Sequence, residues 1–395
     1  MARKIDPTSI PKEWKYDLLD KFAVRCSGHT PSQSFPEYWD GGIKWISLAD
    51  SNRLDKGYIF NTSKEISEEG VKNSSAVLLP AETVVLSRDA GIGKSAVMYE
   101  PMAVSQHFIA WKCDNSHKIN SWFLYNWLQL NKTEFERQAV GSTIKTIGLP
   151  YFKKLKIALP PYQEQEKIAQ ILSTWDQAIS AAEKLLKNSQ QQKKALMQQL
   201  LTGKKRLLDE NGVKFSDEWQ RIELGLLLDY QQPTPYLVES TAYSDSYETP
   251  VLTAGKTFIL GYTNESSGIY QDQLPVIIFD DFTTDSKYVN FPFKAKSSAM
   301  KILTAKKGVS IKFVFEAMQM LQFTVGGHQR HWISIFSNLV IPLPNKKEQQ
   351  QIAEVLSLAD QEIETLQKKL DCLQQEKKAL MQQLLTGKKR VKVAA

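Results

Sequence analysis

The sequence is poor in the features that mark secreted, membrane-bound and metal-binding proteins. Its 395 residues include three cysteines, Cys26, Cys113 and Cys372, whose wide spacing fits neither a disulfide framework nor a metal site. The five histidines show no metal-ligand spacing. No run approaches the roughly 18 apolar residues of a membrane span, and the start lacks the apolar core of a signal peptide. We therefore expect a soluble, cytoplasmic protein that binds no metal.

The composition is that of a folded protein with a basic surplus. Hydrophobic residues make up 42% and aromatic residues 10% of the chain, which is enough for a sizeable core, and the length suggests two or three domains. The net charge of +7 favours a polyanionic partner, although surpluses of this size also occur in proteins that never contact DNA.

An internal repeat dominates the sequence. KKALMQQLLTGKKR occurs unchanged at 193–206 and 377–390, an offset of 184, and the same offset aligns the segments that begin at Ile157 and Ile341. A shorter echo, PKEWKYDLLD at 11–20 and SDEWQRIELG at 216–225, has an offset of 205. The chain thus contains two copies of one plan, a divergent globular segment followed by a nearly invariant helical one.

Both helical segments carry a heptad seam. Apolar residues alternate at spacings of four and three while most other positions are Gln, Lys or Glu, so each helix buries only a narrow stripe. The seam residues are Ile168, Leu172, Trp175, Ile179, Leu186, Leu196 and Leu200 in the first segment, and Ile352, Leu356, Ile363, Leu366, Leu370, Leu380 and Leu384 in the second. Two matching seams in one chain are satisfied most simply by antiparallel packing on each other; an intermolecular coiled coil is the alternative.

The predicted fold is α+β: two mixed α/β domains separated by two long antiparallel coiled-coil helices, with a pseudo-two-fold internal repeat. Prolines before the helices and glycines after them, Gly203 and Gly387, mark the ends of rods of about forty residues. The expected boundaries are a first domain at 1–160, a helix at 161–206, a second domain at 207–344, a helix at 345–390 and a tail at 391–395.

Three segments resemble catalytic motifs but lack a residue or strand that each motif requires. The segment 88–96 ends like a phosphate-binding loop, but position 88 is Arg where the motif needs its first glycine. LPPY at 159–162 resembles an amino-methyltransferase motif, but Leu159 replaces its polar residue. Asp280, Asp281 and Asp285 with Lys287 lack the second strand of a metal-dependent nuclease. We therefore predict no catalytic residues and no cofactor in this chain.

The globular segments offer loop residues with the hydrogen-bonding groups that contact bases and phosphates. A glycine and polar loop precedes each helical segment at a similar distance, GSTIKT in the first copy and GGHQRH in the second. The predicted DNA-binding residues are Ser87, Arg88, Lys94, Gln106, His107, Ser142, Thr143 and Lys145 in the first domain, and Lys256, Tyr262, Lys287, His328, Gln329, Arg330 and His331 in the second. An ordinary surface role is the alternative for each of them.

The sequence resembles the specificity subunits of type I restriction-modification systems over nearly its whole length. The resemblance rests on SRDAGIGKSA with AVSQHF, on GSTIKTI, on the EQEKIAQIL and EQQQIAEVL helix starts, and on LMQQLLTGKKR at both helix ends. In the second domain PVLTAGKTFILGYTN and PVIIFDDFT are similar to a recurrent target-recognition domain.

The resemblance implies a DNA-binding, non-catalytic subunit. Each target-recognition domain would bind one half of a bipartite site in double-stranded DNA, while the helices set the spacing and hold two adenine methyltransferase subunits, through which restriction subunits join. S-adenosylmethionine, ATP and Mg²⁺ would bind those partners, and no membrane is involved. Two alternatives stay open: a structural coiled-coil protein associated with DNA, and a fused methyltransferase or nuclease with unrecognised motifs.

Overall fold

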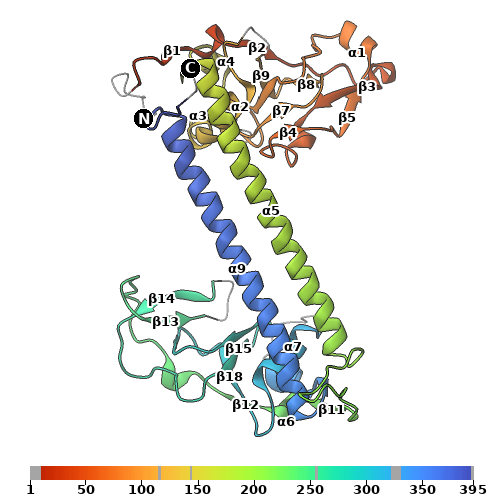
Figure 1. Ribbon diagram of the computed structural model, residues 1–395, viewed down its shortest axis with the longest axis vertical. Helices are drawn as coiled ribbons and strands as arrows, with labels where there is room; N and C mark the ends of the chain where they lie inside the picture. The colour runs from red at the N-terminus through yellow and green to blue at the C-terminus, as the bar shows by residue number, and fades with distance from the viewer. Residues whose placement is uncertain (1–9, 114–116, 143–144, 254–256, 322–330, 393–395) are drawn as a thin grey trace. The chain divides into compact units, whose positions relative to one another are not determined.

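The computed structural model describes residues 10–113, 117–142, 145–253, 257–321 and 331–392. The chain forms two compact units: unit 1 combines Met1–Glu183 with Lys369–Ala395, and unit 2 is Lys184–Lys368. Two long helices, α5 (Tyr162–Leu200) and α9 (Lys346–Leu384), are each shared between the units (Figure 1).

Unit 1 is built on three small sheets with both parallel and antiparallel pairs. The five-stranded sheet has the order β2 (Val24–Ser27), β9 (Phe108–Lys112), β6 (Val84–Ser87), β7 (Ser95–Met98) and β4 (Tyr58–Ile59). The three-stranded sheet has the order β5 (Lys64–Ile66), β3 (Trp39–Ile46) and β8 (Ala103–Val104). The third sheet pairs β1 (Lys15–Leu18) with β10 (Lys156–Leu159).

In the described part of unit 1 there are four short α-helices: α1 (Glu68–Lys72), α2 (Ser121–Leu130), α3 (Lys132–Gln138) and α4 (Leu149–Lys153). The aromatic run at 119–130 predicts a core helix, and α2 occupies it with Phe123, Leu124 and Leu128 fully buried. Its first turn is capped by Asn120, whose side chain accepts from the Phe123 amide at 3.0 Å.

Unit 2 repeats this organisation with different strand counts. Its four-stranded sheet has the order β12 (Leu228–Gln231), β18 (Met300–Ala305), β15 (Val276–Asp280) and β16 (Ser286–Val289). The three-stranded sheet has the order β14 (Ile259–Thr263), β13 (Thr249–Leu252) and β17 (Lys294–Ala295), and β11 (Gln220–Glu223) pairs with β19 (Val340–Leu343). Its short helices are α6 (Leu224–Leu227), α7 (Ile311–Gln319) and α8 (His331–Ser334).

The two repeated segments, which have different offsets, pair with each other in the two-stranded sheets. In unit 1, Lys15 from the short echo pairs with Leu159 from the long repeat, and in unit 2 the equivalent Gln220 pairs with Leu343. The short echo is therefore conserved because it supplies the partner strand for the segment that leads into each long helix.

Within each unit, half of α5 packs antiparallel on half of α9. In unit 1, Glu164 contacts Arg390 and Asp176 contacts Lys377, so residue numbers increase along one segment while they decrease along the other. Unit 2 repeats the pattern with Lys193 on Asp360 and Arg206 on Glu348. The predicted antiparallel helix pair is confirmed.

The heptad stripe is the inward side of these helices. All fourteen predicted seam residues are buried or half-buried, and Ile168, Leu172, Ile352 and Leu356 are fully buried in the cores of their units. Gly203 and Gly387, with φ of +72° and +75°, follow the helix ends in the left-handed conformation that glycine adopts without strain. None of the described helices is long and apolar enough to cross a bilayer.

Candidate nucleic-acid interface

In unit 1, a series of side-chain contacts that includes Asp89 links four loops that are distant in sequence. The Asp89 carboxylate contacts Nδ1 of His107 through one oxygen and accepts from the Thr146 hydroxyl through the other. His107 Nε2 lies 3.5 Å from Nε2 of Gln106, and the amide oxygen of Gln106 accepts from Thr30. With Nδ1–H donating to Asp89, His107 Nε2 accepts from Gln106, so every group in the chain has a matching role.

Arg88 ties the same loops together through the backbone. Its amide donates to the His107 carbonyl at 3.0 Å, and its side-chain Nε donates to the Ile147 carbonyl at 3.0 Å. The Ile147 amide in turn donates to the Arg88 carbonyl at 2.9 Å. The turn after β6, the loop before β9 and the segment before α4 therefore form one bonded surface.

A hollow of about 300 Å³ lies beside this surface, lined by Gly91, Ile92, Lys94, Lys132, Glu136 and Lys145. Nζ of Lys94 donates to the carbonyl and hydroxyl of Ser51 at 3.0 and 3.1 Å, and Nζ of Lys132 lies 2.6 Å from Oδ2 of Asp55. Lys145 and Glu136 are exposed. Three of the residues that line the hollow are therefore lysines, and the ammonium groups of two of them are held in place.

The structure groups most of the residues predicted for the first domain. Arg88, Gln106 and His107 belong to the Asp89 network, Lys94 and Lys145 line the hollow, and Ser142 is exposed on the adjoining segment. Ser87 is different: it is 1% exposed and its hydroxyl donates to the Ala90 carbonyl, so it supports the turn from inside. Thr143 lies outside the described residues.

The second domain gathers fewer of its predicted residues. Lys287 is exposed and pairs with Asp285 at 3.3 Å, and Tyr262 is half-buried in β14. His331 is fully buried, with Nδ1 at 2.9 Å from the Asp281 carbonyl, so its ring stabilises the domain interior. Lys256, His328, Gln329 and Arg330 lie outside the described residues.

The acidic cluster after β15 has a structural explanation. Asp280 accepts from the amides of Phe282 and Thr283, and Asp281 is 2% exposed with Oδ2 at 3.4 Å from Nζ of the buried Lys301. Backbone amides and a buried cation thus occupy these carboxylates. Within the described ranges, no group of three or more His, Cys, Asp or Glu side chains is arranged to hold a metal ion.

The other catalytic resemblances also resolve into structural features. Ser95 begins β7 where a phosphate-binding loop requires a helix, and LPPY is the end of β10 followed by the first residue of α5.

Each domain is joined to its helices by a buried glutamine. Gln165 in α5 is fully buried, accepts from the Asn120 amide at 2.8 Å and donates to the carbonyls of Lys118 and Pro160. Gln349 in α9 accepts from the Ser310 amide at 2.9 Å and donates to the Pro344 carbonyl. Asn120 and Ser310 are the N-caps of α2 and α7, so one glutamine places an equivalent helix in each unit.

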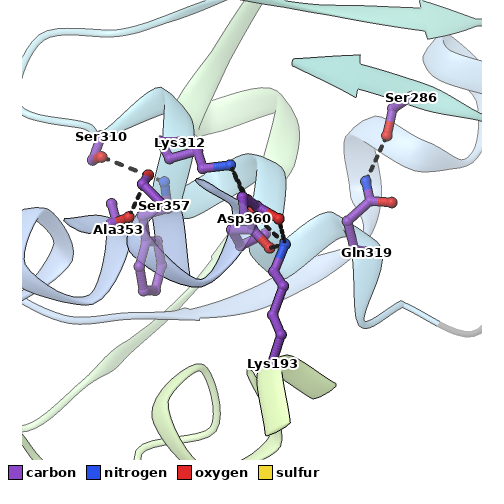
Figure 2. A network of polar contacts seen from close by, with 10 residues as sticks. Lys193, Ser286, Ser310, Lys312, Gln319, Ala353, Ser357 and Asp360 are labelled. Carbon is purple, nitrogen blue, oxygen red and sulfur yellow. Dashed lines mark hydrogen bonds and ion pairs between the residues drawn. The ribbon is translucent and has the colours of Figure 1, made fainter. Parts of the chain in front are cut away.

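A charged network adds to this joint in unit 2 (Figure 2). Lys193 of α5 lies 2.5 Å from Asp360 of α9 and 3.1 Å from Glu316 of α7. Lys312 of α7 contacts the same two carboxylates at 2.8 and 2.7 Å. Burial alone would raise the pKa of Asp360, but hydrogen bonds from Lys193 and Lys312 outweigh it and hold that pKa below its ordinary value.

The helix ends are fixed by bidentate ion pairs. Nε and Nη2 of Arg206 contact the two carboxylate oxygens of the buried Glu348 at 2.6 Å each, and the Trp219 indole donates to the same glutamate at 3.0 Å. The hydrogen bond to Glu348 raises the pKa of Arg206 above its ordinary value. In unit 1, Arg390 contacts Glu164 at 2.8 Å through two nitrogens.

Asp89, Lys132, Gln165 and Gln349 are the residues that sequence reasoning missed. Asp89 stands beside the predicted Arg88, but only the fold shows that its partners come from two other loops. The glutamines carry a readable signal, since both follow the helix-opening prolines at equivalent positions of the repeat.

The comparisons with known proteins agree with this organisation. A sequence profile for the type I restriction modification DNA specificity domain matches residues 11–190 and again 216–375. The specificity subunit of the Escherichia coli type I restriction enzyme EcoR124I/EcoR124II is 54% identical over 132 residues, which is 32% of this chain and 32% of that relative. The putative MjaX specificity subunit of Methanocaldococcus jannaschii is 25% identical over an alignment of 429 positions covering 99% of this chain and 97% of that protein.

A solved structure shares the fold. The crystal structure of the type I restriction-modification S subunit from M. genitalium aligns with a TM-score of 0.64 at 15% identity, covering 95% of this chain and 96% of that one. Since the family profile matches both globular segments together with most of the helix that follows each, the chain belongs to the type I restriction-modification DNA-specificity family and has two target-recognition domains.

Proposed function

We propose that this chain is the specificity subunit of a type I restriction-modification complex and that each target-recognition domain reads one half of a bipartite site in double-stranded DNA. The observation that carries this proposal is the repetition of one DNA-specificity domain whose helical part is nearly invariant while its loop chemistry differs. Two domains that are attached to their helices in the same way but carry different loops can recognise two different half-sites.

The chain supplies recognition, and its partners supply chemistry. Two adenine methyltransferase subunits bind the paired helices, and restriction subunits join through them, so S-adenosylmethionine, ATP and Mg²⁺ are bound by those partners. The complex acts on cytoplasmic DNA. The purified chain alone is expected to show no methyltransferase, nuclease or ATPase activity.

Sequence-specific binding is tested by assembling the chain with its methyltransferase subunits and selecting duplexes from a random library. We expect two short conserved blocks separated by an unread spacer, with binding that weakens steeply as salt rises. Replacing residues 20–155 with the first domain of another family member should change one block only. A library returned without sequence preference favours a structural coiled-coil protein, and methyl transfer by the isolated chain favours a fused enzyme.

We further propose that the helix pair sets the spacer. Adding one heptad after Lys184 and one after Lys368 keeps both seams in phase, because seven residues are one full repeat of the seam. Both insertions fall where the chain passes between the units. Seven residues lengthen a helix by about 10 Å, which is about three base pairs. A folded variant is expected to select the same blocks with a longer spacer. Selection of the original spacer by a folded variant contradicts the role of the helices.

A further inference from the structure

The lysine-lined hollow of unit 1 has the charge of an anion site. Lys94, Lys132 and Lys145 face it, against the exposed Glu136 on its lining and Asp55 behind Lys132. Asp55 is already satisfied, because its Oδ1 accepts from the Ser95 amide and Gln129 while its Oδ2 pairs with Lys132. The surplus that remains toward solvent is positive.

The lysines keep hydrogen-bond donors for a ligand. An ammonium group has three N–H donors. Lys94 uses two of them on Ser51 and Lys132 uses one on Asp55, so each retains at least one. These internal bonds also fix the two ammonium groups before a ligand arrives, which lowers the entropy lost on binding.

The backbone beside the lysines is shaped for close approach. Gly91 and Gly93 have φ of +79° and +78°, and a Cβ at Gly91 would lie 2.8 Å from the Ser51 hydroxyl oxygen. A side chain there would be strained and would crowd the contact between Ser51 and Lys94. The turn therefore brings bare backbone to the edge of the hollow.

The hollow adjoins groups suited to base edges. Gln106 is exposed, and its contacts to Thr30 and His107 leave one amide hydrogen and one oxygen lone pair unused. One donor beside one acceptor is a combination that reads bases in the major groove. Asp89 holds this edge by binding His107, and it binds Thr146, the residue next to Lys145.

We propose that this hollow binds a backbone phosphate of the DNA beside the half-site read by the first domain, and that Asp89 positions the Gln106–His107 edge over the adjoining bases. The proposal rests on the proposed function and assigns separate tasks to its residues. The lysines contribute affinity without regard to sequence, while the Gln106–His107 edge contributes sequence discrimination.

Salt dependence separates these tasks. The full chain, assembled with its methyltransferase subunits, is titrated by fluorescence anisotropy with a selected duplex and with a duplex scrambled in the first block. Lys145→Ala is the main variant because its side chain is exposed. Lys72→Ala, which removes another exposed lysine of unit 1, from α1, is the matched control.

We expect Lys145→Ala to weaken binding to both duplexes by about tenfold and to reduce the slope of log K against log salt by about 0.9. Lys72→Ala should leave that slope unchanged. Gln106→Ala should keep the slope but lower discrimination at one position of the first block by about fivefold or more. Asp89→Asn should resemble Gln106→Ala, because it acts through the edge.

Three results overturn the proposal: a wild-type slope in Lys145→Ala, an equal loss of slope in Lys72→Ala, or a changed slope without changed discrimination in Gln106→Ala. Thermal unfolding of each variant confirms that it is folded. Failure of the wild-type complex to select any bipartite site is a different result, since it removes the proposed function itself.

Discussion

In unit 1, Lys377 of α9 pairs with Asp176 of α5, whereas in unit 2 the equivalent Lys193 pairs with Asp360 and also with Glu316 of the globular segment. The lysine and the aspartate of this pair are the same in both units, so the added contact in unit 2 comes from the domain. α7 brings a lysine and a buried glutamate to the joint, while α2 brings aromatic side chains and the buried Asn126. Helices that share one lysine–aspartate pair thus pack against domains of different polarity.

The largest difference between the units is expected at the helix ends. Arg206→Met removes the cation opposite a fully buried glutamate and should destabilise unit 2 by about 3–5 kcal/mol. Arg390→Met should cost unit 1 less, about 1–2 kcal/mol, because Arg390 is 38% exposed, against 16% for Arg206, so water screens more of this ion pair. The buried Glu164 also keeps the Val391 amide as a partner. Hydrogen exchange of peptides from each unit measures both effects. Equal losses would mean that burial does not distinguish the two pairs.

The buried glutamines should contribute about equally to the stability of the two units. Gln165→Leu and Gln349→Leu each leave a helix N-cap amide and at least one carbonyl without a partner, at a cost of about 1–3 kcal/mol per variant. Protection of α2 and α7 in hydrogen exchange reports the loss. A large effect in one unit alone would show that the joints are not built alike.

The mid-helix lysines should separate the units again, by a smaller amount. Lys193→Met leaves the buried Glu316 with Lys312 as its remaining ion-pair partner and should cost unit 2 about 2 kcal/mol. Lys377→Met should cost unit 1 less than about 1 kcal/mol, because Asp176 is 42% exposed. Hydrogen exchange in increasing denaturant, read from peptides of each unit, compares the two losses. A greater loss for Lys377→Met would contradict the larger contribution that we assign to the network in Figure 2.

Acid should produce the smallest change. The folded pKa of Asp360 is below its ordinary value, so its contribution to stability is present above the unfolded pKa, about 3.9, and is lost as pH falls through the folded pKa. Asp360→Asn should therefore flatten the decline of the unfolding free energy of unit 2 as pH falls from about 5 through the folded pKa of Asp360. Denaturant titrations of both proteins across that range give the comparison, and identical slopes would contradict it.

The helix pair could be predicted because its signal is local and periodic. Ile168 and Leu172 lie one turn apart on one face, and that spacing needs no knowledge of the partner. The same spacing of four and three residues also places Lys193 and Lys377 on the seam, between Leu186 and Leu196 and between Leu370 and Leu380, and periodicity does not explain a lysine there. Their carboxylate partners, Asp360 and Asp176, lie 167 and 201 residues away in the chain, so the fold alone shows why a lysine is tolerated there.

The interface could be predicted only in part. Loop composition selected Arg88, Gln106 and His107 for their hydrogen-bonding groups, and the fold brings these three residues together beside Asp89. Loop composition also included Ser87 and His331, which are buried, because composition does not indicate which side of a loop a residue faces. Asp89 and Lys132 were missed because their roles depend on contacts between loops.

In each domain the first and last strands pair with each other, so the length of the domain between them does not change how the domain is attached to its helix. Leu159 follows its partner Lys15 by 144 positions and Leu343 follows its partner Gln220 by 123, yet both pairs have the same antiparallel register. Since the chain leaves each domain beside the point where it entered, the 21 residues of difference disturb neither helix. This geometry predicts that a domain can change in size and loop content as long as its first and last strands still pair.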